Sequence, residues 1–407
     1  MKNAEAKGGI APLDVPIIDI DPFATEFLLD PYPNHDALRD PGPVVWLSQY
    51  EIYAMARFEE VRSALLDHET FLSGRGVGLS DFAKQEPWRP PSLLLEADPP
   101  LHERTRAIMQ SVVSPASLKR LEPVWKLRAE SLADDLVTRG RFDAVADLSE
   151  VYPMLVFPDA VGLMEDGREH LLVYAATVFN AFGPQNDLLA ESLVAARDAA
   201  VWVARACKRE NLCKSGWGMG VYEAADSGAC TPEEAERLVR SLLSAGVDTT
   251  VNGIATTIHA LTQFPDQWKK LRDNPRLVRR AVEESLRWDS TVQTFFRTTS
   301  RDVRIGGVVI PEHSKVLLFL GAANRDPRKW DRPDAFDIAR STSGHVGFGA
   351  GIHQCLGQMI ARLESQLILT ALMERCGSIK IAGPVRRRAN NTLHAVESLP
   401  VVVSPSS

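Results

Sequence analysis

The stretch Phe348-Gly349-Ala350-Gly351-Ile352-His353-Gln354-Cys355-Leu356-Gly357 gathers three glycines and a histidine around one cysteine. Glycine allows positive φ and lets the backbone approach a flat group closely. A helix is predicted to begin after the cysteine, because apolar residues follow at helical spacing: Leu356, Met359, Ile360, Leu363 and Leu367. The free N–H groups of a helix start favour an anion, so they are expected to hold Cys355 as a thiolate. The alternative, common for a lone cysteine, is an inert buried thiol in a glycine-rich turn.

A second long helix is predicted from Thr231 to about Phe264. Thr231 can cap it, Pro232 suits its first position, and Glu234 completes a capping box. Its middle is interrupted by Ala245-Gly246-Val247-Asp248-Thr249. A glycine inside a helix is unfavourable by about 1 kcal/mol relative to alanine. This segment is therefore either a notch for helix packing or a site of function.

The rest of the pattern predicts a mainly α chain with a minor β region built from both ends of the sequence. Residues 1–16 are expected to form a flexible arm and residues 17–407 a single domain without a linker. Further helices are expected after Asp30-Pro31-Tyr32-Pro33 and from Asn274-Pro275 to Trp288, and Gly377 is expected to cap the last helix. The expected strands are a hairpin of Val44–Leu47 and Ile52–Met55, then Phe295–Thr299, Val303–Ile310 and Val316–Leu320.

Composition narrows the class of protein. The 407 residues are 45% hydrophobic and 24% charged, which is ordinary for a globular protein. A net charge of -7 argues against binding nucleic acid or an anionic membrane through bulk charge. No apolar run approaches the roughly 18 residues of a membrane span, and the first 16 residues lack the apolar core of a secretory signal. Five cysteines without a CxxC pair favour a reducing cytoplasm over a disulfide framework.

The cysteine stretch resembles the haem-binding signature of the cytochrome P-450 family, Phe-x-x-Gly-x-His-x-Cys-x-Gly. Two further segments, Asn324-Arg325-Asp326-Pro327 and Phe336 to Arg340, also resemble the family, as does the pair Glu284 and Arg287. Taken alone, that pair is more simply a surface ion pair; in the family such a pair locks its helix to the loop before the cysteine. The resemblance implies the P-450 fold, with a long helix across the haem and Cys355 as the metal ligand of haem b.

The same resemblance assigns contacts with the cofactor and with dioxygen. Asp248 is expected to relay protons, and Thr249 to hydrogen-bond the bound oxygen or its water. The haem propionates are expected to contact His102, Arg106, Arg297 and His353. The other expected haem contacts are Ala245, Gly246, Phe348, Gly349 and Gly357.

Several stretches look like one bacterial subfamily that oxidises para-substituted benzoic acids: Gly76 to Phe82, Arg89 to Ser92, Glu96 to Pro100, Val239 to Gly246 and Gln293 to Thr299. The likeness assigns the substrate carboxylate to Arg89, Ser92, Ser241 and Ser244. It assigns the ring to Leu95, Phe179, Phe182 and Phe295. Helical spacing puts Ser241, Ser244, Ala245 and Asp248 on one face, and a turn is about 5.4 Å, so a benzoate has the right length. Otherwise the serines are small packing residues and Arg89 is a surface charge.

The expected reaction inserts one atom of dioxygen into the para substituent, as in conversion of 4-methoxybenzoate to 4-hydroxybenzoate and formaldehyde. A monomer is expected, with electrons reaching it from NAD(P)H through a ferredoxin reductase and a [2Fe–2S] ferredoxin. The alternatives are the same fold acting on a terpenoid or fatty acid, a hydrogen peroxide-dependent peroxygenase, and a non-catalytic haem sensor or carrier. Residues 183–222 depart from the subfamily, so tolerance for ring substituents is left open.

Overall fold

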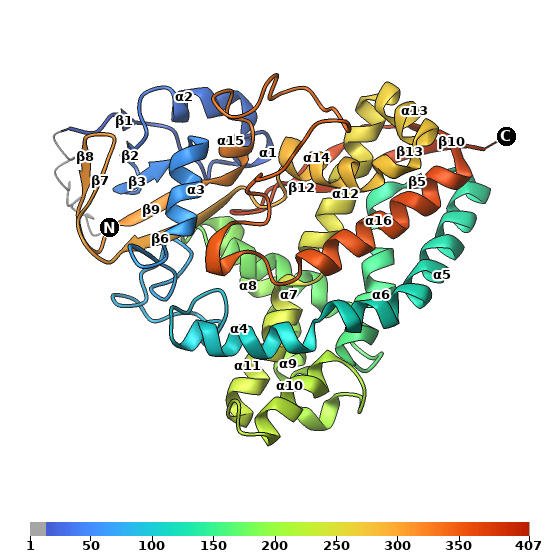
Figure 1. Ribbon diagram of the computed structural model, residues 1–407, viewed down its shortest axis with the longest axis horizontal. Coiled ribbons are helices and arrows are strands. Elements are labelled where there is room, and N and C mark those ends of the chain that lie inside the picture. The colour runs from blue at the N-terminus through green and yellow to red at the C-terminus, as the bar shows by residue number, and fades with distance from the viewer. Residues whose placement is uncertain (1–13, 407) are drawn as a thin grey trace.

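The computed structural model describes residues 14–406. A helical body occupies most of the molecule, and a sheet region at one side brings the two halves of the sequence together (Figure 1). The expected flexible arm lies largely outside the described residues. Within them, Val15 is buried and the Trp46 N–H donates to Pro16 O at 2.8 Å, so the packed structure begins before residue 17.

The main sheet has six strands in the order β1-β2-β3-β9-β6-β4. The predicted hairpin of β2 and β3 is confirmed as an antiparallel pair, and β3 then pairs with β9 in parallel. The strands of this sheet are β1 (Ile17–Ile18), β2 (Val45–Leu47), β3 (Ile52–Met55), β4 (Phe71–Leu72), β6 (Thr294–Thr299) and β9 (Lys315–Phe319).

The expected strand Val303–Ile310 is instead a small hairpin, β7 (Val303–Ile305) and β8 (Val308–Ile310). Gly306 and Gly307 both have positive φ and turn the chain between the two strands. The remaining strands form smaller sheets: β5 (Arg141–Asp143), β10 (Cys376–Ile381) and β13 (Pro400–Pro405) in one, β11 (Arg386–Arg388) and β12 (Ala395–Ser398) in another.

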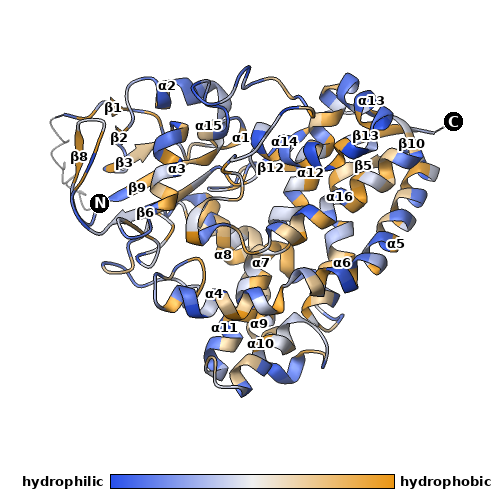
Figure 2. Ribbon diagram, in the orientation of Figure 1, coloured by the Kyte–Doolittle hydropathy of each residue, from blue (hydrophilic) through white to orange (hydrophobic). Residues whose placement is uncertain are grey.

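Sixteen α-helices lie within the described residues. They fall into short helices near the sheet and longer ones in the helical body, where α7 is rich in apolar residues and α13 is largely hydrophilic (Figure 2). The helices are α1 (Thr25–Leu29), α2 (His35–Arg39), α3 (Phe58–Leu66), α4 (Leu101–Val112), α5 (Pro115–Arg139), α6 (Val151–Val161), α7 (His170–Asn180), α8 (Asp187–Ala195), α9 (Arg197–Ala206), α10 (Trp217–Asp226), α11 (Pro232–Ala245), α12 (Asp248–Gln263), α13 (Pro265–Asp273), α14 (Val278–Trp288), α15 (Leu320–Asn324) and α16 (Gln358–Arg375).

The predicted central helix is interrupted. Its start is as expected, with a capping box between Thr231 and Glu234, but α11 ends at Ala245 and α12 begins at Asp248. Gly246 stands in the interruption because a Cβ there would lie 2.1 Å from Cζ of Phe157 on α6. The close approach of α6 therefore explains why residue 246 is a glycine.

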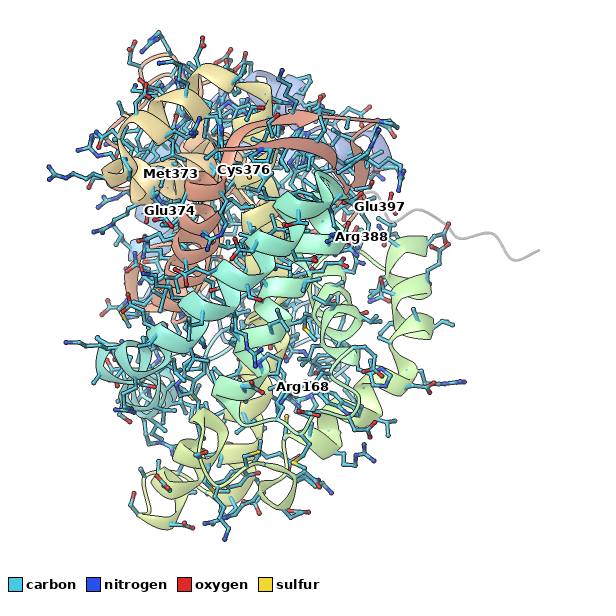
Figure 3. The ribbon with its side chains drawn as sticks, turned by 90° about the vertical axis from the view of Figure 1, so that its right-hand side faces the viewer. Arg168, Met373, Glu374, Cys376, Arg388 and Glu397 are labelled. Carbon is cyan, nitrogen blue, oxygen red and sulfur yellow. The ribbon has the colours of Figure 1, made fainter. Side chains whose placement is uncertain are left out.

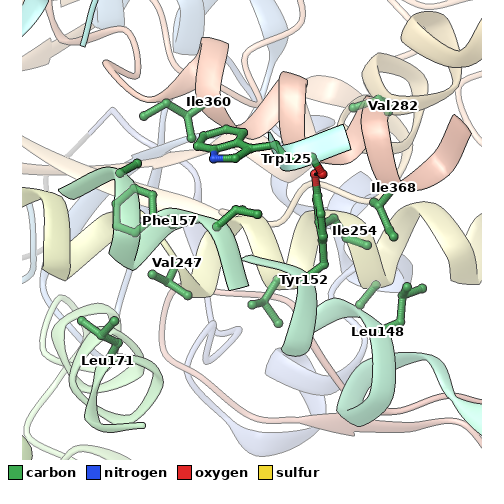
Figure 4. Close-up of a cluster of buried hydrophobic side chains, with 14 of the residues drawn as sticks. Trp125, Leu148, Tyr152, Phe157, Leu171, Val247, Ile254, Val282, Ile360 and Ile368 are labelled. Atoms are coloured by element: carbon green, nitrogen blue, oxygen red, sulfur yellow. Dashed lines mark hydrogen bonds between the residues drawn. The ribbon is translucent and has the colours of Figure 1, made fainter. Parts of the chain in front are cut away.

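The largest hydrophobic core surrounds this central pair of helices. It includes Trp125 of α5, Tyr152 of α6 and Ile360 of α16, which converge with Val247 and Ile254 of the central segment (Figure 4). Burial of these large side chains fixes α12 against α16, the helix that follows the cysteine stretch.

The end of α16 differs from the prediction. The helix passes directly into β10, with Cys376 extended at its end, and Gly377 lies in the strand. A Cβ at Gly377 would lie 2.8 Å from the carbonyl oxygen of Pro405, so close strand pairing accounts for this glycine. No helix among residues 14–406 combines the length and apolar character needed to cross a membrane.

Candidate functional site

A cavity lies between the central helices and the cysteine stretch. Most of the residues singled out from the sequence line it, although they come from distant parts of the chain. These are Arg89, Ser92, Leu95, Arg106, Phe179, Phe182, Ser241, Ser244, Ala245, Gly246, Thr249, Phe295, Arg297, Phe348, Gly349, His353, Cys355 and Gly357. His102, Asp248, Glu284 and Arg287 are outside the lining.

Cys355 is a free thiol that is exposed toward this cavity. Its N–H donates to Phe348 O at 2.9 Å, which closes the cysteine stretch into a loop. Gly351 has φ +72°, and a Cβ there would lie 2.5 Å from Leu65 O, so this position requires glycine. The loop thus presents the sulfur to the cavity just ahead of α16.

The helix start was expected to favour a Cys355 thiolate, and two backbone N–H groups there act in that direction. Burial raises the pKa of the Cys355 thiol and outweighs the backbone N–H groups of Gly357 and Gln358, which act in the opposite direction together with the Arg106 guanidinium. A thiolate at this position therefore needs a cationic partner inside the cavity, and a metal ion meets that need.

Two imidazoles and two guanidinium groups beside the loop have no carboxylate hydrogen-bond partner among the described residues. The rings of His102 and His353 lie 4.2 Å apart between centroids, and none of their four nitrogens has a hydrogen-bond partner within the described residues. Burial lowers the pKa of Arg297 to about 10, and its guanidinium donates to the Phe296 carbonyl at 2.8 Å. Arg106 donates to Gln354 O at 2.7 Å. Donors converging on a cavity with a thiol fit haem, because its two propionates supply the missing anions.

Thr249 and Asp248 take different places at the start of α12. Thr249 lines the cavity, and its hydroxyl donates to Ala245 O at 2.9 Å. Asp248 was expected on the same helix face as the cavity-lining serines, but it lies outside the cavity lining and contacts Arg388. The hydroxyl of Thr249 therefore faces the cavity, and the carboxyl of the preceding residue, Asp248, lies outside the cavity lining.

The environment of Asp248 connects the helix interior to the surface. Burial raises its pKa to about 6, against the lowering effects of Arg388 and of a hydrogen bond from Asn252. Arg388 Nη2 lies 3.5 Å from Asp248 Oδ1, and its side chain is 45% exposed on β11, where Figure 3 shows it near Glu397 of β12. Asp248 Oδ2 has no partner among the described residues. A carboxyl that titrates near neutrality and touches a surface arginine is suited to transfer protons.

Polar groups gather at another part of the cavity. The hydroxyls of Ser92 and Ser241 lie 3.3 Å apart, and Ser244 donates to the Arg240 carbonyl at 2.8 Å. Arg240 also lines the cavity and donates to Pro90 O at 2.7 Å. Arg89 lines the cavity too. Guanidinium and hydroxyl groups in this arrangement can bind an anion.

Three phenylalanines form an apolar wall. Phe182 packs against Phe179 and Phe295 with ring centroids 5.7 and 5.8 Å away. These distances are typical of aromatic contacts, and a wall of phenylalanine rings favours binding of a planar ligand. Leu95 lines the same cavity.

Glu284 and Arg287 form a fully buried ion pair, with both side chains 0% exposed and Arg287 Nε 2.8 Å from Glu284 Oε2. Arg287 also donates to three backbone carbonyls, those of Asn324, Pro333 and Ala335. Arg340 adds a contact of 3.1 Å to Glu284. The pair therefore ties α14 to both of the segments that precede the cysteine loop.

Sequence reasoning missed two residues that contact the site. Glu96 Oε2 lies 3.2 Å from Arg89 Nη1, and Arg388 contacts Asp248. For Glu96 the sequence offered one local clue: it follows Ser92 by four residues in a proline-rich loop, a spacing that suggests a turn. Arg388 is 140 residues from Asp248 in number, and nothing in the chain pattern joins them.

Comparison with known proteins agrees with this geometry. The profile of the family described as Cytochrome P450 matches residues 218–386. Cytochrome p450 CYP199A2 of Rhodopseudomonas palustris is 54% identical over 393 residues, which cover 96% of this chain and 95% of the relative.

Two solved structures share the fold. Cytochrome P450 CREJ in complex with (4-ethylphenyl) dihydrogen phosphate has a TM-score of 0.85 and 26% identity, covering 94% of this chain and 99% of that one. P450BioI in complex with hexadec-9Z-enoic acid ligated acyl carrier protein has a TM-score of 0.82 and 31% identity, covering 93% and 100%. The chain therefore belongs to the cytochrome P450 family and is a haem-dependent monooxygenase.

Proposed function

We propose that this cytochrome P450 oxidises the para substituent of small aromatic carboxylic acids, with O-demethylation of 4-methoxybenzoate as the representative reaction. The observation that carries the proposal is a cavity lined by Arg89 and serine hydroxyls, by three phenylalanines, and by Thr249 and Cys355. An anion site, an aromatic wall and an oxidising centre match the three parts of such a substrate.

The spacing along the central helices supports the size of the substrate. On α11 Ser241 and Ser244 are about 4.5 Å apart in helix rise. Thr249 follows just beyond the interruption, and its hydroxyl donates to the carbonyl of Ala245, the neighbour of Ser244. A benzoate with its carboxylate at the serines therefore has its para group near Thr249. A longer acid would need to fold back or leave the cavity.

In this mechanism Arg89, Ser92, Ser241 and Ser244 bind the carboxylate, and Phe179, Phe182, Phe295 and Leu95 hold the ring. Haem bound through Cys355 supplies the reductive activation of dioxygen. Thr249 would hold a cavity water through its hydroxyl, and Asp248 would deliver protons from the surface side. The propionates would be contacted by His102, Arg106, Arg297 and His353. The cofactor pocket would be lined by Ala245, Gly246, Phe348, Gly349 and Gly357.

The overall reaction balances with one molecule each of substrate, dioxygen and NAD(P)H and one proton. It yields 4-hydroxybenzoate, formaldehyde, NAD(P)⁺ and water. The electrons come from NAD(P)H through a ferredoxin reductase and a [2Fe–2S] ferredoxin. The enzyme that receives them is proposed to be a monomer.

Related structures bear on the substrate class. The para-substituted phenyl phosphate bound to CREJ shows that this fold accepts a para-alkyl ring with an anionic head group. The fatty acyl group in the P450BioI complex keeps a fatty acid as the second candidate, because an arginine and serines can bind either carboxylate. The phenylalanine wall favours the aromatic acid.

The test is a titration of the ferric haem protein, followed by its Soret band. 4-Methoxybenzoate should shift the band and bind at least tenfold more tightly than its methyl ester, because only the acid carries the charge that Arg89 recognises. Turnover with NADH, ferredoxin and reductase should then release formaldehyde. Equal binding of acid and ester, or tighter binding of hexadecenoic acid, would contradict the proposal. Turnover with hydrogen peroxide alone, at the rate of the complete system, would identify a peroxygenase instead.

A further inference from the structure

A half-buried lysine ammonium donates hydrogen bonds to three backbone carbonyls. Lys315 is the first residue of β9, opposite Thr298 on β6. Its Nζ donates to Arg75 O at 3.2 Å, Gly76 O at 2.8 Å and Gly78 O at 2.9 Å. An ammonium has three N–H donors, so these carbonyls use its full capacity.

The three carbonyls belong to one closed loop, residues 75–82, which we name the wall loop. The Phe82 N–H donates to Arg75 O at 3.1 Å and closes the wall loop at its ends. Arg75 Nε donates to Asp81 Oδ1 at 2.9 Å, and Gly76 adopts φ +95°. This curvature turns the carbonyl oxygens toward one point, where their partial negative charges repel one another unless a cation stands between them.

The wall loop supports the aromatic wall of the cavity. The Leu79 N–H donates to Phe182 O at 2.9 Å, and the Phe296 N–H donates to Val77 O at the same distance. Gly78 lies so close that a Cβ on it would be 2.7 Å from Phe182 Cα. The backbone of Phe182 is therefore held by the wall loop, and its ring lines the cavity.

We propose that Lys315 is a positioning residue for substrate binding: its ammonium acts as an internal cation that fixes the wall loop and, through it, Phe182. Lys315 lies outside the cavity lining, so it acts through the wall loop. The inference depends on the proposed function only in the choice of aromatic acid for one measurement.

The charged groups around Lys315 set the conditions of the test. Burial lowers its pKa to about 7; Asp81 and Glu96 act to raise it, whereas Arg75 and Arg297 act to lower it. Measurements at pH 6 therefore keep the native ammonium charged.

The decisive experiment is amide hydrogen exchange in haem-loaded Lys315→Ala, read at the amides of Leu79 and Phe296. Without the ammonium both amides should exchange about tenfold faster or more, because charge-assisted hydrogen bonds are lost from three carbonyls. Ethylammonium added at millimolar concentration should restore protection by occupying the vacated position. Tetramethylammonium, which has the same charge and no N–H, should not restore it.

A matched variant separates positioning from filling of space. Lys315→Met keeps the length of the side chain and leaves no room for an added amine, so its exchange should be fast and insensitive to ethylammonium. If Lys315→Ala does not fold, Lys315→Gln, which keeps two N–H donors, should show intermediate exchange. Unchanged exchange at both amides in the folded variants, or equal rescue by tetramethylammonium, would overturn the proposal.

The effect on the cavity is read as affinity for 4-methoxybenzoate. Lys315→Ala should weaken its binding about tenfold, and ethylammonium should return most of the loss. Unchanged affinity in a variant with fast exchange would overturn the link to Phe182. If native protein fails to bind this acid, the proposed function fails, while the exchange result still decides the role of Lys315 in the wall loop.

Discussion

Arg89 Nη1 lies 3.2 Å from Glu96 Oε2, with the two side chains 9% and 4% exposed. The same oxygen accepts the Ser92 N–H at 2.6 Å. The arginine assigned to the substrate carboxylate therefore already faces an anion in the free protein. Because Arg240 also lines the cavity, the polar end retains a net positive charge and can accept one more anion.

Arg89→Met should weaken binding of 4-methoxybenzoate about 10- to 100-fold, the range expected for loss of a charged hydrogen bond. The loss includes repulsion, because Glu96 becomes an unpaired carboxylate next to the substrate carboxylate. Binding of the neutral methyl ester should change little. Soret titration of both ligands measures the difference.

Glu96→Gln provides the control. It removes the competing charge, so the acid should bind more tightly than to native protein, and the Arg89→Met/Glu96→Gln double variant should recover part of the loss. Equal effects of Arg89→Met on the acid and the ester would show that Arg89 does not recognise the carboxylate.

Asp248→Asn should slow product formation about 100-fold, a typical contribution of a positioned acid or base. Substrate affinity should stay near the native value, since Asp248 lies outside the cavity lining. Turnover assays measure the rate of product formation, and Soret titration measures substrate affinity.

Thr249→Ala, which removes the neighbouring hydroxyl, should keep consuming NADH but release hydrogen peroxide. Native coupling in Thr249→Ala would remove Thr249 from the proton path.

The same acid makes stability depend on pH. The folded pKa of Asp248 is raised to about 6 from 3.8, so the folded protein holds this proton more tightly than the unfolded chain. Its contribution is therefore greatest below pH 4, falls as the pH rises to 6, and stays low above that, a total change of about 3 kcal/mol. Denaturant unfolding should show Asp248→Asn gaining stability relative to native protein across this window.

Arg388→Met tests the cause of that profile. Arg388 lowers the pKa of Asp248, so its removal should move the upper end of the window above pH 6. A difference between native protein and Asp248→Asn that did not vary between pH 4 and 6 would contradict the assignment.

Local patterns predicted much of the fold. The capping box at Thr231, the hairpin of β2 and β3 and the helix after Cys355 depend on neighbours in the sequence, and each is confirmed. The chain pattern marked the segment around Gly246 as unusual for a helix, but it could not reveal that the partner packed against this glycine is Phe157 on another helix. Gly377 was misread for the same reason, since strand pairing with Pro405 decides its place.

The candidate site shows the same division. Helical spacing correctly placed Ser241, Ser244 and Ala245 along one cavity, but it also placed Asp248 there, whereas Asp248 lies outside the cavity lining. The contact of Glu96 with Arg89 is short in sequence, yet a proline-rich loop has no periodicity that reveals which side chains meet. Contacts of this kind are set by packing between segments.

The buried brace of α14 gives the last prediction. Arg287→Met leaves Glu284 fully buried with only Arg340 as a charged partner, and breaking such a pair typically costs about 3–5 kcal/mol. The haem-loaded protein should lose that much unfolding free energy, and its haem content should fall, because the segments before the cysteine loop lose their anchor. The exposed pair of Lys269 and Asp273, 2.8 Å apart on α13, is the matched control, and its removal should cost less than about 1 kcal/mol. A loss for Arg287→Met no larger than that for Lys269→Met would show that the pair does not brace the haem-binding core.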